Sequence, residues 1–300
     1  MQTHTQKVAA LGEVLWDMLP EGRRLGGAPT NFACHVAQFG LDACLVSAVG
    51  DDEPGHTAID ELNRRGLGRY IAVVPDHPTG TVGVQLDAAG VPAYEIRRDA
   101  AWDFIPWTDA LAELAAGVQA VCFGTLAQRS PVSRQTLTRF LDTMPRDGKR
   151  LRVLDVNLRP PLPADDTIVD ALARCNVLKL NDEELPRVTA AVGFPPDTPP
   201  EEAARRLVAD CGLRALILTC GATGSHVFTP EAESHLATPE VDVADTVGAG
   251  DSFTAAFTAA LLCGADVAKA HRLAVRTSAY VCTQHGATPT LPADITQATR

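Results

Sequence analysis

A glycine-rich stretch around residues 248–250 has the residue types of an anion-binding turn. Residues 241–247 alternate β-branched and polar side chains, and an apolar helical pattern follows. We therefore predict a strand that turns through glycines into a helix, whose free N–H groups could bind an anion. Asp245 and Asp251 bracket the glycines. The acid Asp251 would have a function there if a cation is also present and its carboxylate accepts a proton from an attacking hydroxyl. The alternative is an ordinary turn with an acid at a helix N-terminus, where carboxylates are favoured anyway.

Further polar residues come directly after predicted strands. Ligands collect at the carboxyl ends of parallel strands, so we expect these residues to share one site with the glycine-rich turn. They are Asp17, Gly27, Asn31, Gly124, Thr125, Asp155, Asn157, Arg159, Asn181, Glu184, Gly221 and Gly224.

Short apolar runs alternate with helical patterns along most of the chain. This predicts an α/β fold with a doubly wound, mostly parallel central sheet flanked by helices. Residues 81–86 and 93–97 instead alternate around a turn, which predicts an antiparallel hairpin with one polar face. We expect one domain, residues 1–300, with a small antiparallel β lid from about residues 13–25 and 70–105. The strands of the central sheet are expected at residues 8–11, 45–49, 118–123, 151–156, 177–180 and 215–219.

Composition narrows the class of protein. The chain has 300 residues, 46% of them hydrophobic and 21% charged, which favours a large folded core. The formal net charge of −11 argues against a nucleic-acid partner. No apolar run approaches the length of a membrane span, and residues 1–7 are too polar for a signal peptide. The eight cysteines form no C-x-x-C pair, which is typical of buried thiols in a reducing compartment, and we expect a cytoplasmic protein.

Several common catalytic motifs are missing from the sequence. It has no Gly-x-x-x-x-Gly-Lys-Ser/Thr P-loop, no G-x-G-x-x-G after the first strand and no G-x-S-x-G elbow. These absences argue against a Walker-type nucleotidase, a Rossmann dehydrogenase and an α/β-hydrolase. The histidines are isolated, and His35 lies in a mostly apolar helical pattern, so we expect it to pack rather than to bind a ligand.

Two stretches and three landmarks occur in a characteristic order. The stretches are Gly26-Gly27-Ala28-Pro29-Thr30-Asn31 and Asp245-Thr246-Val247-Gly248-Ala249-Gly250-Asp251. The landmarks are Asp155-Val156-Asn157-Leu158-Arg159-Pro160, Asn181-Asp182-Glu183-Glu184 and Thr219-Cys220-Gly221-Ala222-Thr223-Gly224. Over nearly its whole length the chain therefore resembles the ribokinase-like (PfkB-type) sugar kinases. Gly12-Glu13 followed by Asp17 makes it most similar to fructokinases within that family.

The resemblance implies ATP-dependent phosphorylation of a sugar. Asp251 corresponds to the base that accepts the proton of a primary hydroxyl, and Gly248, Ala249 and Gly250 correspond to an anion hole for the transferred phosphoryl group. The sugar would be bound by Asp17, Gly27, Asn31, Arg97, Asn157 and Arg159. For Arg97 and Arg159 an ordinary exposed position is the alternative.

The resemblance also implies sites for the nucleotide and for cations. ATP would contact Lys179, Thr219, Gly221, Gly224, Gly248 and Gly250. Asn181 and Glu184 would hold Mg²⁺ through water, the alternative being a plain helix-capping pair. Asp245 and Thr246, with carbonyl groups of residues 282–287, would bind a monovalent cation such as K⁺.

Within the family the lid covers the sugar, and two lids often pair in a homodimer; Val82, Val84 and Tyr94 offer an apolar face for this. The expected reaction converts fructose to fructose 6-phosphate. The same chemistry on 2-keto-3-deoxygluconate, ribose or another sugar is the alternative, because residues 94–103 depart from the fructokinase pattern. An inactive sugar-binding regulator is an alternative of another class, against which the intact Asp251, Asn181 and Glu184 argue.

Overall fold

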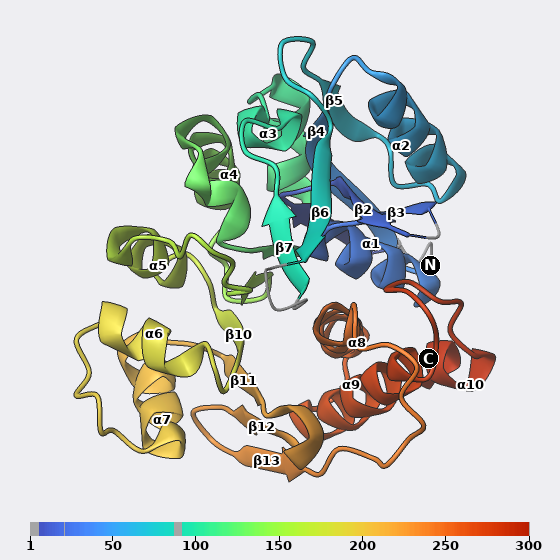
Figure 1. Ribbon diagram of the computed structural model, residues 1–300. Coiled ribbons are helices and arrows are strands. Elements are labelled where there is room, and N and C mark those ends of the chain that lie inside the picture. The colour runs from blue at the N-terminus through green and yellow to red at the C-terminus, as the bar shows by residue number, and fades with distance from the viewer. Residues whose placement is uncertain (1–5, 21, 87–91, 300) are drawn as a thin grey trace, which may run out of the picture.

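A large sheet runs through the middle of the molecule (Figure 1). The computed structural model describes residues 6–20, 22–86 and 92–299. Over these residues the sheet has nine strands, and all neighbours are parallel except at the edge formed by β12 and β13. In spatial order the strands are β13 (Glu233–Leu236), β12 (Ser225–Phe228), β11 (Ala215–Thr219), β10 (Val177–Asn181), β9 (Leu151–Asp155), β8 (Ala120–Phe123), β1 (Lys7–Leu11), β4 (Asp42–Val49) and β5 (Tyr70–Val73).

Side chains of each strand alternate between two hydrophobic cores, one on each face of the sheet. Val8 and Ala10 of β1 belong to one core, and Ala9 and Leu11 belong to the other. The first core is covered by α1 (Ala28–Gln38), α2 (Glu53–Arg64), α8 (Ala249–Leu262), α9 (Val267–Cys282) and α10 (Ala293–Thr296). The second is covered by α3 (Asp109–Gly117), α4 (Pro131–Thr143), α5 (Asp165–Leu172), α6 (Leu185–Ala191) and α7 (Pro200–Asp210). Helices on both faces confirm the predicted doubly wound α/β fold.

A second, four-stranded sheet has the order β3 (Gly22–Gly26), β2 (Leu15–Leu19), β6 (Gly80–Leu86) and β7 (Pro92–Ile96). The outer pairs are antiparallel, as predicted for a small antiparallel sheet, whereas β2 and β6 pair in parallel. The strand β5 falls within the range expected for the lid but pairs with β4 in the large sheet. The side chains of Val84 and Tyr94, expected on an apolar lid face, lie outside the described part of the chain, whereas Val82 is 9% exposed.

A partly buried ion pair holds the small sheet to the body of the protein. The guanidinium group of Arg129 donates to both carboxylate oxygens of Asp103, at 2.8 and 2.7 Å, and lies 4.0 Å above the Trp102 ring. It also donates to the carbonyl oxygen of Arg97, one residue beyond β7. A side chain at Gly80 in β6 would collide with Trp102. The base of the β6–β7 hairpin is therefore fixed against the core.

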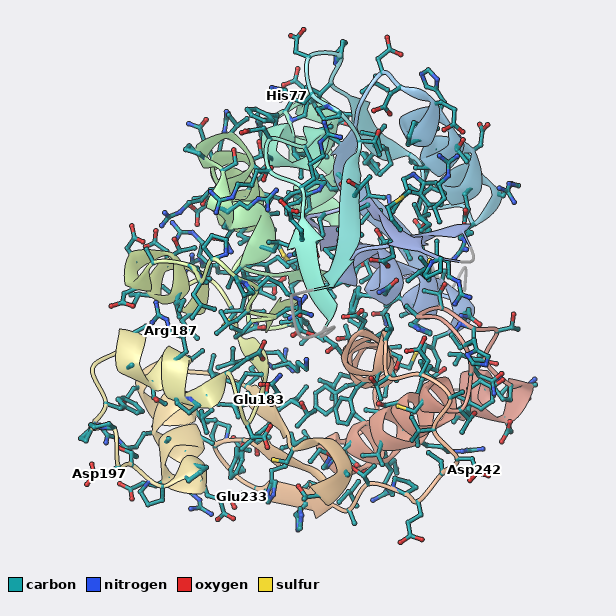
Figure 2. The ribbon with its side chains drawn as sticks, in the orientation of Figure 1. His77, Glu183, Arg187, Asp197, Glu233 and Asp242 are labelled. Carbon is teal, nitrogen blue, oxygen red and sulfur yellow. The ribbon has the colours of Figure 1, made fainter. Side chains whose placement is uncertain are left out.

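The strand predicted at residues 241–247 is wrong. In the structure this segment is an irregular connection between β13 and α8, and no pairing of it with another strand is found in the described chain. Figure 2 shows Asp242 at the periphery of the molecule, and Val243 is 62% exposed. Alternation of side chains favours a strand only where a neighbouring strand completes its hydrogen bonds. Here the segment is instead held by hydrogen bonds from the N–H groups of Ala244 and Asp245 to the carbonyl oxygen of Cys282.

The described residues contain no helix that is both long and apolar enough to cross a membrane.

Candidate active site

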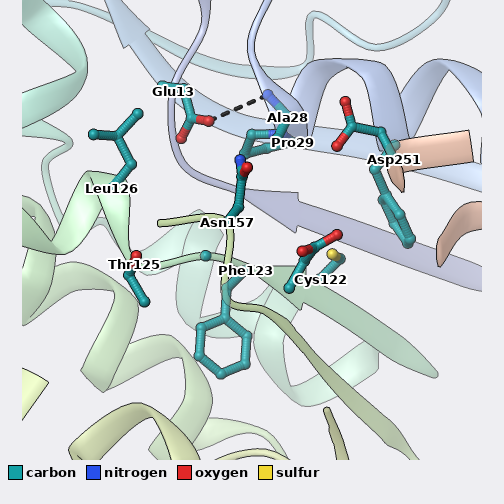
Figure 3. Close-up of a pocket in the computed structure, with 12 residues that line it drawn as sticks. Glu13, Ala28, Pro29, Cys122, Phe123, Thr125, Leu126, Asn157 and Asp251 are labelled. Carbon is teal, nitrogen blue, oxygen red and sulfur yellow. Dashed lines mark hydrogen bonds between the residues drawn. The ribbon is translucent and has the colours of Figure 1, made fainter. Parts of the chain in front are cut away.

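A pocket opens at the carboxyl ends of β1 and β8, two adjacent strands from which the chain continues toward opposite edges of the sheet. From β1 the chain continues through α1 to β4 on one side, and β8 to β11 lie on the other side. Such a switch point is the expected place for a ligand in an open α/β sheet. Figure 3 shows the pocket between the start of α1, the end of β8 and the start of α8. Its lining residues are Glu13, Ala28, Pro29, Phe32, Cys122, Phe123, Gly124, Thr125, Leu126, Asp155, Asn157 and Asp251.

Asp251 lies in the first turn of α8 and lines this pocket. Its Oδ2 accepts a hydrogen bond of 2.8 Å from Nδ2 of Asn31 on α1. Burial raises the pKa of Asp251 to about 6, and the charge of Asp155 acts in the same direction. The hydrogen bond from Asn31 and the charges of Lys179 and Arg159 act against this shift. The carboxyl can therefore change its protonation state near neutral pH, as a proton acceptor must.

Asn31 has an unused acceptor beside this pair. The residue is 5% exposed, and its Oδ1 is buried without a hydrogen-bond partner in the described part of the molecule. A buried carbonyl oxygen without a partner is unfavourable unless a ligand or water donates to it. Asn31 therefore fits its predicted place in a ligand site.

A buried ion pair lies beneath the start of α8. Nζ of Lys179 donates to Oδ1 of Asp155 at 3.0 Å, and Oγ1 of Thr254 donates to Oδ2 at 3.0 Å. A Cβ atom added to Gly250 would lie 2.9 Å from Nζ of Lys179. The nearby carboxylates, Asp155 first, keep the pKa of Lys179 above its ordinary value although burial opposes this. Lys179 thus brings a positive charge close to the glycine turn.

The glycine turn leaves donors available at the start of α8. Gly248 has φ +77°, and a Cβ atom there would lie 2.6 Å from the carbonyl oxygen of Ala287. The N–H groups of Ala249 and Ser252 bond to the carbonyl oxygens of Thr246 and Gly248. For the N–H groups of Gly250 and Asp251, the described residues offer no backbone acceptor outside the helix. Free N–H groups at a helix N-terminus have the polarity that an anion requires.

The residues predicted to bind a monovalent cation join two loops. Oδ1 of Asp245 accepts from the N–H of Val247 at 3.0 Å, and Oδ2 accepts from the N–H of Gly286 at 3.1 Å. Thr246 is exposed and contributes its carbonyl oxygen to the turn. Asp245 therefore ties the glycine turn to residues 282–287, the segment expected to supply carbonyl ligands. A role of this junction in cation binding stays a prediction.

Asn181 and Glu184 hydrogen-bond reciprocally in the turn that leads into α6. The N–H of Asn181 donates to Oε2 of Glu184 at 2.9 Å, and the N–H of Glu184 donates to Oδ1 of Asn181 at 2.7 Å. Oε1 of Glu184 accepts from the N–H of Leu158 at 2.8 Å. Among the described residues no group of three or more His, Cys, Asp or Glu side chains could hold a metal ion. This geometry has the form of the capping alternative and leaves room for Mg²⁺ only through water.

Among the residues predicted to contact the sugar, Asn157 lines the pocket, whereas Asp17 and Gly27 are not among its lining residues. Asp17 on β2 is partly buried, and burial raises its pKa. A Cβ atom on Gly26 would collide with the Asp17 carboxylate, and one on Gly27, which has φ +103°, would meet the carbonyl oxygen of Glu13. Asn157 lines the pocket with φ 43°, a left-handed conformation that is uncommon among non-glycine residues but that asparagine adopts more readily than most.

The two predicted arginines differ in their relation to the pocket. Arg159 is exposed, and its charge lowers the pKa of both Glu13 and Asp251, which places it near the pocket. Arg97 is exposed at the end of the β6–β7 hairpin, where its backbone N–H donates to the carbonyl oxygen of Thr81 at 3.0 Å. No side-chain contact of Arg97 with the pocket residues is found in the described chain.

The remaining predicted nucleotide contacts lie at the end of β11. Thr219 pairs in register with Asn181. Gly221 is exposed, and Gly224 has φ +141° with the carbonyl oxygen of Leu236 too close for a side chain. None of these residues lines the pocket, so a nucleotide contacting them would approach α8 from the β11 side.

Three residues of the site were given no role from the sequence. Glu13 and Cys122 line the pocket, and Thr254 hydrogen-bonds to Asp155. Glu13 follows the first strand directly and is 4% exposed, so an acid immediately after a buried apolar strand was the available signal. Thr254 and Cys122 lie inside apolar runs and give no signal of this kind.

The predicted packing role of His35 agrees with its position. It is 0% exposed, and its Nε2 pairs with the carbonyl oxygen of Ala287 at 2.9 Å. Burial lowers its pKa to about 4, so the ring is neutral and donates from Nε2 in this pair. His35 thereby connects α1 to the segment that contacts Gly248.

Two known carbohydrate kinases are 30% identical to this chain. Fructokinase of Klebsiella pneumoniae is 30% identical over 266 residues, which cover 85% of this chain and 84% of that protein. A 2-dehydro-3-deoxygluconokinase of Thermoproteus tenax is also 30% identical, over 90% of this chain and 83% of that protein.

The fold also matches a solved structure. A fructokinase of Xylella fastidiosa with bound ATP superposes with a TM-score of 0.83 at 22% identity, over 99% of this chain and 98% of that one. The family model described as pfkB family carbohydrate kinase matches residues 21–294. The chain therefore belongs to the pfkB family of carbohydrate kinases.

Proposed function

We propose that this carbohydrate kinase transfers the γ-phosphoryl group of ATP to the 6-hydroxyl of fructose, with Asp251 as the base. The observation that carries the proposal is the combination at the start of α8. A carboxyl with a pKa of about 6 lines the pocket, held by Asn31, beside N–H groups that have no acceptor in the described chain. Relatives named fructokinase support the choice of sugar.

In the proposed reaction Asp251 accepts the proton of the sugar hydroxyl as the hydroxyl oxygen bonds to the γ-phosphorus. The bond from phosphorus to the bridging oxygen of ADP breaks, and that oxygen leaves with the bonding electrons. The transition state of such transfers is loose, so alignment and charge neutralisation matter more than a strong base. The glycine turn at residues 248–250 would receive the charge that develops on the transferred group, and the N–H of Gly250, which has no acceptor in the described chain, would be a donor to it. Lys179, whose Nζ lies 2.9 Å from a Cβ position on Gly250, is buried and would add positive potential there.

The sugar would lie between the small sheet and the pocket. Asp17 would accept hydrogen bonds from sugar hydroxyls, and Oδ1 of Asn31, buried and unpartnered, would accept another. Gly27 leaves space beside them, because its backbone conformation and the carbonyl oxygen of Glu13 exclude a side chain. Asn157, which lines the pocket, would lie against the sugar. The exposed Arg159 and Arg97 would approach the sugar or its phosphate from the solvent side.

The nucleotide and its cations would lie beside the glycine turn. Thr219, Gly221 and Gly224 at the end of β11 would border the ATP phosphates, with Lys179 acting through Gly250. Mg²⁺ fits Asn181 and Glu184 only through water, because both Glu184 oxygens accept backbone N–H groups. When bound, it would neutralise phosphate charge. Asp245, Thr246 and carbonyl groups of residues 282–287 would bind K⁺ and so fix the loop behind Gly248.

We also propose how the molecule is organised around this site. Residues 1–300 would form one domain, and residues 13–25 and 70–105 would include a lid that closes over the sugar and excludes water, the competing phosphoryl acceptor. Two lids would pair in a homodimer. The cytoplasm is the proposed location, which the eight unpaired cysteines support.

A specific observation also supports a second sugar, 2-keto-3-deoxygluconate (2-dehydro-3-deoxygluconate), as the acceptor of the phosphoryl group. The Thermoproteus tenax relative, which matches as closely as the Klebsiella protein, is named a 2-dehydro-3-deoxygluconokinase. The two are distinguished by measuring ADP release with fructose, 2-keto-3-deoxygluconate and ribose. Fructose giving the highest kcat/KM, with the phosphate at the 6-position by NMR, supports the proposal. A higher kcat/KM for the acid sugar overturns the choice of fructose.

A further inference from the structure

Glu13 is a second buried carboxyl on the pocket wall, and the proposed mechanism gives it no role. It follows Gly12 at the carboxyl end of β1, is 4% exposed and lines the same pocket as Asp251. Figure 3 shows both carboxyl groups at the rim of this pocket, with Glu13 beside Ala28 and Pro29 at the start of α1.

The position of Glu13 is fixed by the connection that leads into α1. Its Oε1 accepts a hydrogen bond of 3.2 Å from the N–H of Ala28. Its backbone carbonyl oxygen accepts from Oγ1 of Thr30 at 3.3 Å and allows no side chain at Gly27. For the second carboxyl oxygen, the described chain offers no donor from another residue.

The surroundings of Glu13 favour a protonated carboxyl. Burial raises its pKa to about 7, and the charge of Asp251 adds to the shift. Hydrogen bonds from its own N–H and that of Ala28, together with the charge of Arg159, act against it. Besides Glu13 and Asp251, the titratable groups that line this pocket are the thiol of Cys122 and the carboxylate of Asp155, whose charge is offset by Lys179. Near neutral pH a large fraction of Glu13 therefore carries a proton that it can donate.

A purely structural role explains why Glu13 accepts a hydrogen bond from Ala28. It does not explain why the buried side chain is an ionisable carboxyl. One carboxyl oxygen is sufficient to accept the N–H of Ala28, and a glutamine would do so without placing an ionisable group in a buried position. A group of this kind in a pocket, with one oxygen to which no other residue of the described chain donates, is typical of a functional site.

We propose that Glu13 contacts the acceptor sugar and donates a hydrogen bond to one of its oxygens, which sets the affinity for the sugar. This rests on the proposed function, because the sugar is assigned to this pocket. The protonated form binds, so sugar affinity falls as pH rises through about 7. Asp251 must be ionised for the reaction, so kcat/KM has an acidic limb near pH 6 from Asp251 and a basic limb near pH 7 from Glu13.

The test compares Glu13→Gln, Glu13→Ala and the matched control Thr30→Val. Thr30→Val removes a neighbouring hydrogen bond of the same connection but leaves the carboxyl in place. Sugar affinity is measured by titration calorimetry without nucleotide and from KM, with kcat, the KM of ATP and the thermal unfolding temperature, between about pH 5 and 9.

Glu13→Ala is expected to weaken sugar binding by about 10- to 100-fold with little change in the KM of ATP. Glu13→Gln keeps a donor at all pH values, so it is expected to bind the sugar and to lose the basic limb. Thr30→Val is expected to lower only the unfolding temperature. Unchanged sugar affinity in Glu13→Ala, or an unchanged basic limb in Glu13→Gln, overturns the role of Glu13.

Calorimetry separates this proposal from the proposed function. If the wild-type protein binds a sugar but no sugar stimulates ADP release, the phosphoryl-transfer proposal fails, and the affinities of the Glu13 variants still decide the role of Glu13. If ADP release is normal and Glu13→Ala binds the sugar as tightly as the wild type, only the role of Glu13 fails.

Discussion

The chemistry of the site depends on how the fold changes the properties of individual carboxyl groups. Asp251 and Glu13 share one pocket, and burial raises the pKa of each, to about 6 and about 7. Asp155, in contact with Lys179 and Thr254, is held in a buried pair. Burial thus brings both Asp251 and Glu13 into the range in which a carboxyl titrates near neutral pH.

The raised pKa of Asp251 predicts the acidic limb of the rate profile. A protonated carboxyl cannot accept the hydroxyl proton, so kcat/KM for the sugar should fall about tenfold per pH unit as pH decreases below about 6. Steady-state kinetics in buffers of constant ionic strength measure this. A profile that stays level down to about pH 4.5 would contradict the pKa assigned to Asp251.

The raised pKa of Asp251 also predicts that ionisation of this carboxyl, which the reaction requires, lowers the stability of the folded protein. The pKa of Asp251 in the folded protein lies above its model value of 3.8, so folding favours the protonated form. Its contribution to stability is present below about pH 4 and is lost as pH rises through about 6. Asp251→Asn should therefore unfold at a higher temperature than the wild type at pH 7 to 8, a difference that shrinks near pH 4. Calorimetric scans at both pH values check this, and a lower unfolding temperature for the variant at pH 7 to 8 would exclude it.

At the scale of elements, the site is made where α8 begins. Gly248 packs against Ala287, Gly250 packs against Lys179, and α1 contributes Asn31 to the same point. His35 on α1 reaches the carbonyl oxygen of Ala287 from the other side. The start of α8 is therefore positioned by α1, β10 and the segment after α9.

Two glycines that flank α8, each with a positive φ, allow the effects of packing and of backbone conformation to be separated. Gly248→Ala should lower stability by about 1–2 kcal/mol because its φ is +77°, and should also lower kcat by about 10²-fold because the new Cβ would displace the turn from Ala287. Gly264 at the other end of α8 has φ +87° and no atom within 4 Å of a Cβ position, so Gly264→Ala should lose only stability. Urea unfolding and kcat of both variants test this. Equal kcat in the two variants would mean that the Gly248 turn does not position the reacting groups.

Local sequence patterns predicted the buried central strands of the large sheet well. Residues 215–219 form β11 as predicted, and the apolar runs at residues 151–156 and 177–180 form β9 and β10 with ends shifted by one residue. Alternation at residues 241–247 predicted a strand that does not form, because no neighbouring strand pairs with it in the described chain. The parallel pairing of β2 with β6 joins residues about sixty positions apart, and no local pattern contains it.

The same contrast between local patterns and long-range contacts applies to the site residues. Asp251, Asn31 and Asn157 could be placed from their motifs, and all three lie at or beside the pocket. The ion pair of Asp155 with Lys179 crosses two strands, and the pKa of Glu13 depends on burial by distant segments. Neither property is encoded in local spacing. The reciprocal bonds of Asn181 and Glu184 could be foreseen, because that spacing is the spacing of a helix cap.

At the scale of the whole molecule, the small sheet and the glycine turn come from opposite ends of the chain. Residues 80–86 belong to β6, whereas the turn precedes α8 at residue 249, and the sugar is proposed to contact both parts. If the small sheet closes over the sugar, backbone amides of both segments should exchange hydrogen more slowly when sugar binds. Hydrogen–deuterium exchange with sugar alone, nucleotide alone and both together measures this. Protection of the turn without any protection of β6 would exclude the lid.

The most direct test of the account is the turnover of Asp251→Asn. The amide keeps the size of the side chain but cannot accept the hydroxyl proton, so kcat should fall by about 10²- to 10⁴-fold while sugar and ATP still bind. Asp266→Asn is the matched control, since Asp266 also lies at a helix start and accepts from the N–H of Lys269 at 2.7 Å, but belongs to α9 outside the site. The control should keep its kcat. If Asp251→Asn phosphorylates the best sugar at the rate of the wild type, Asp251 is not the base and the proposed mechanism is wrong.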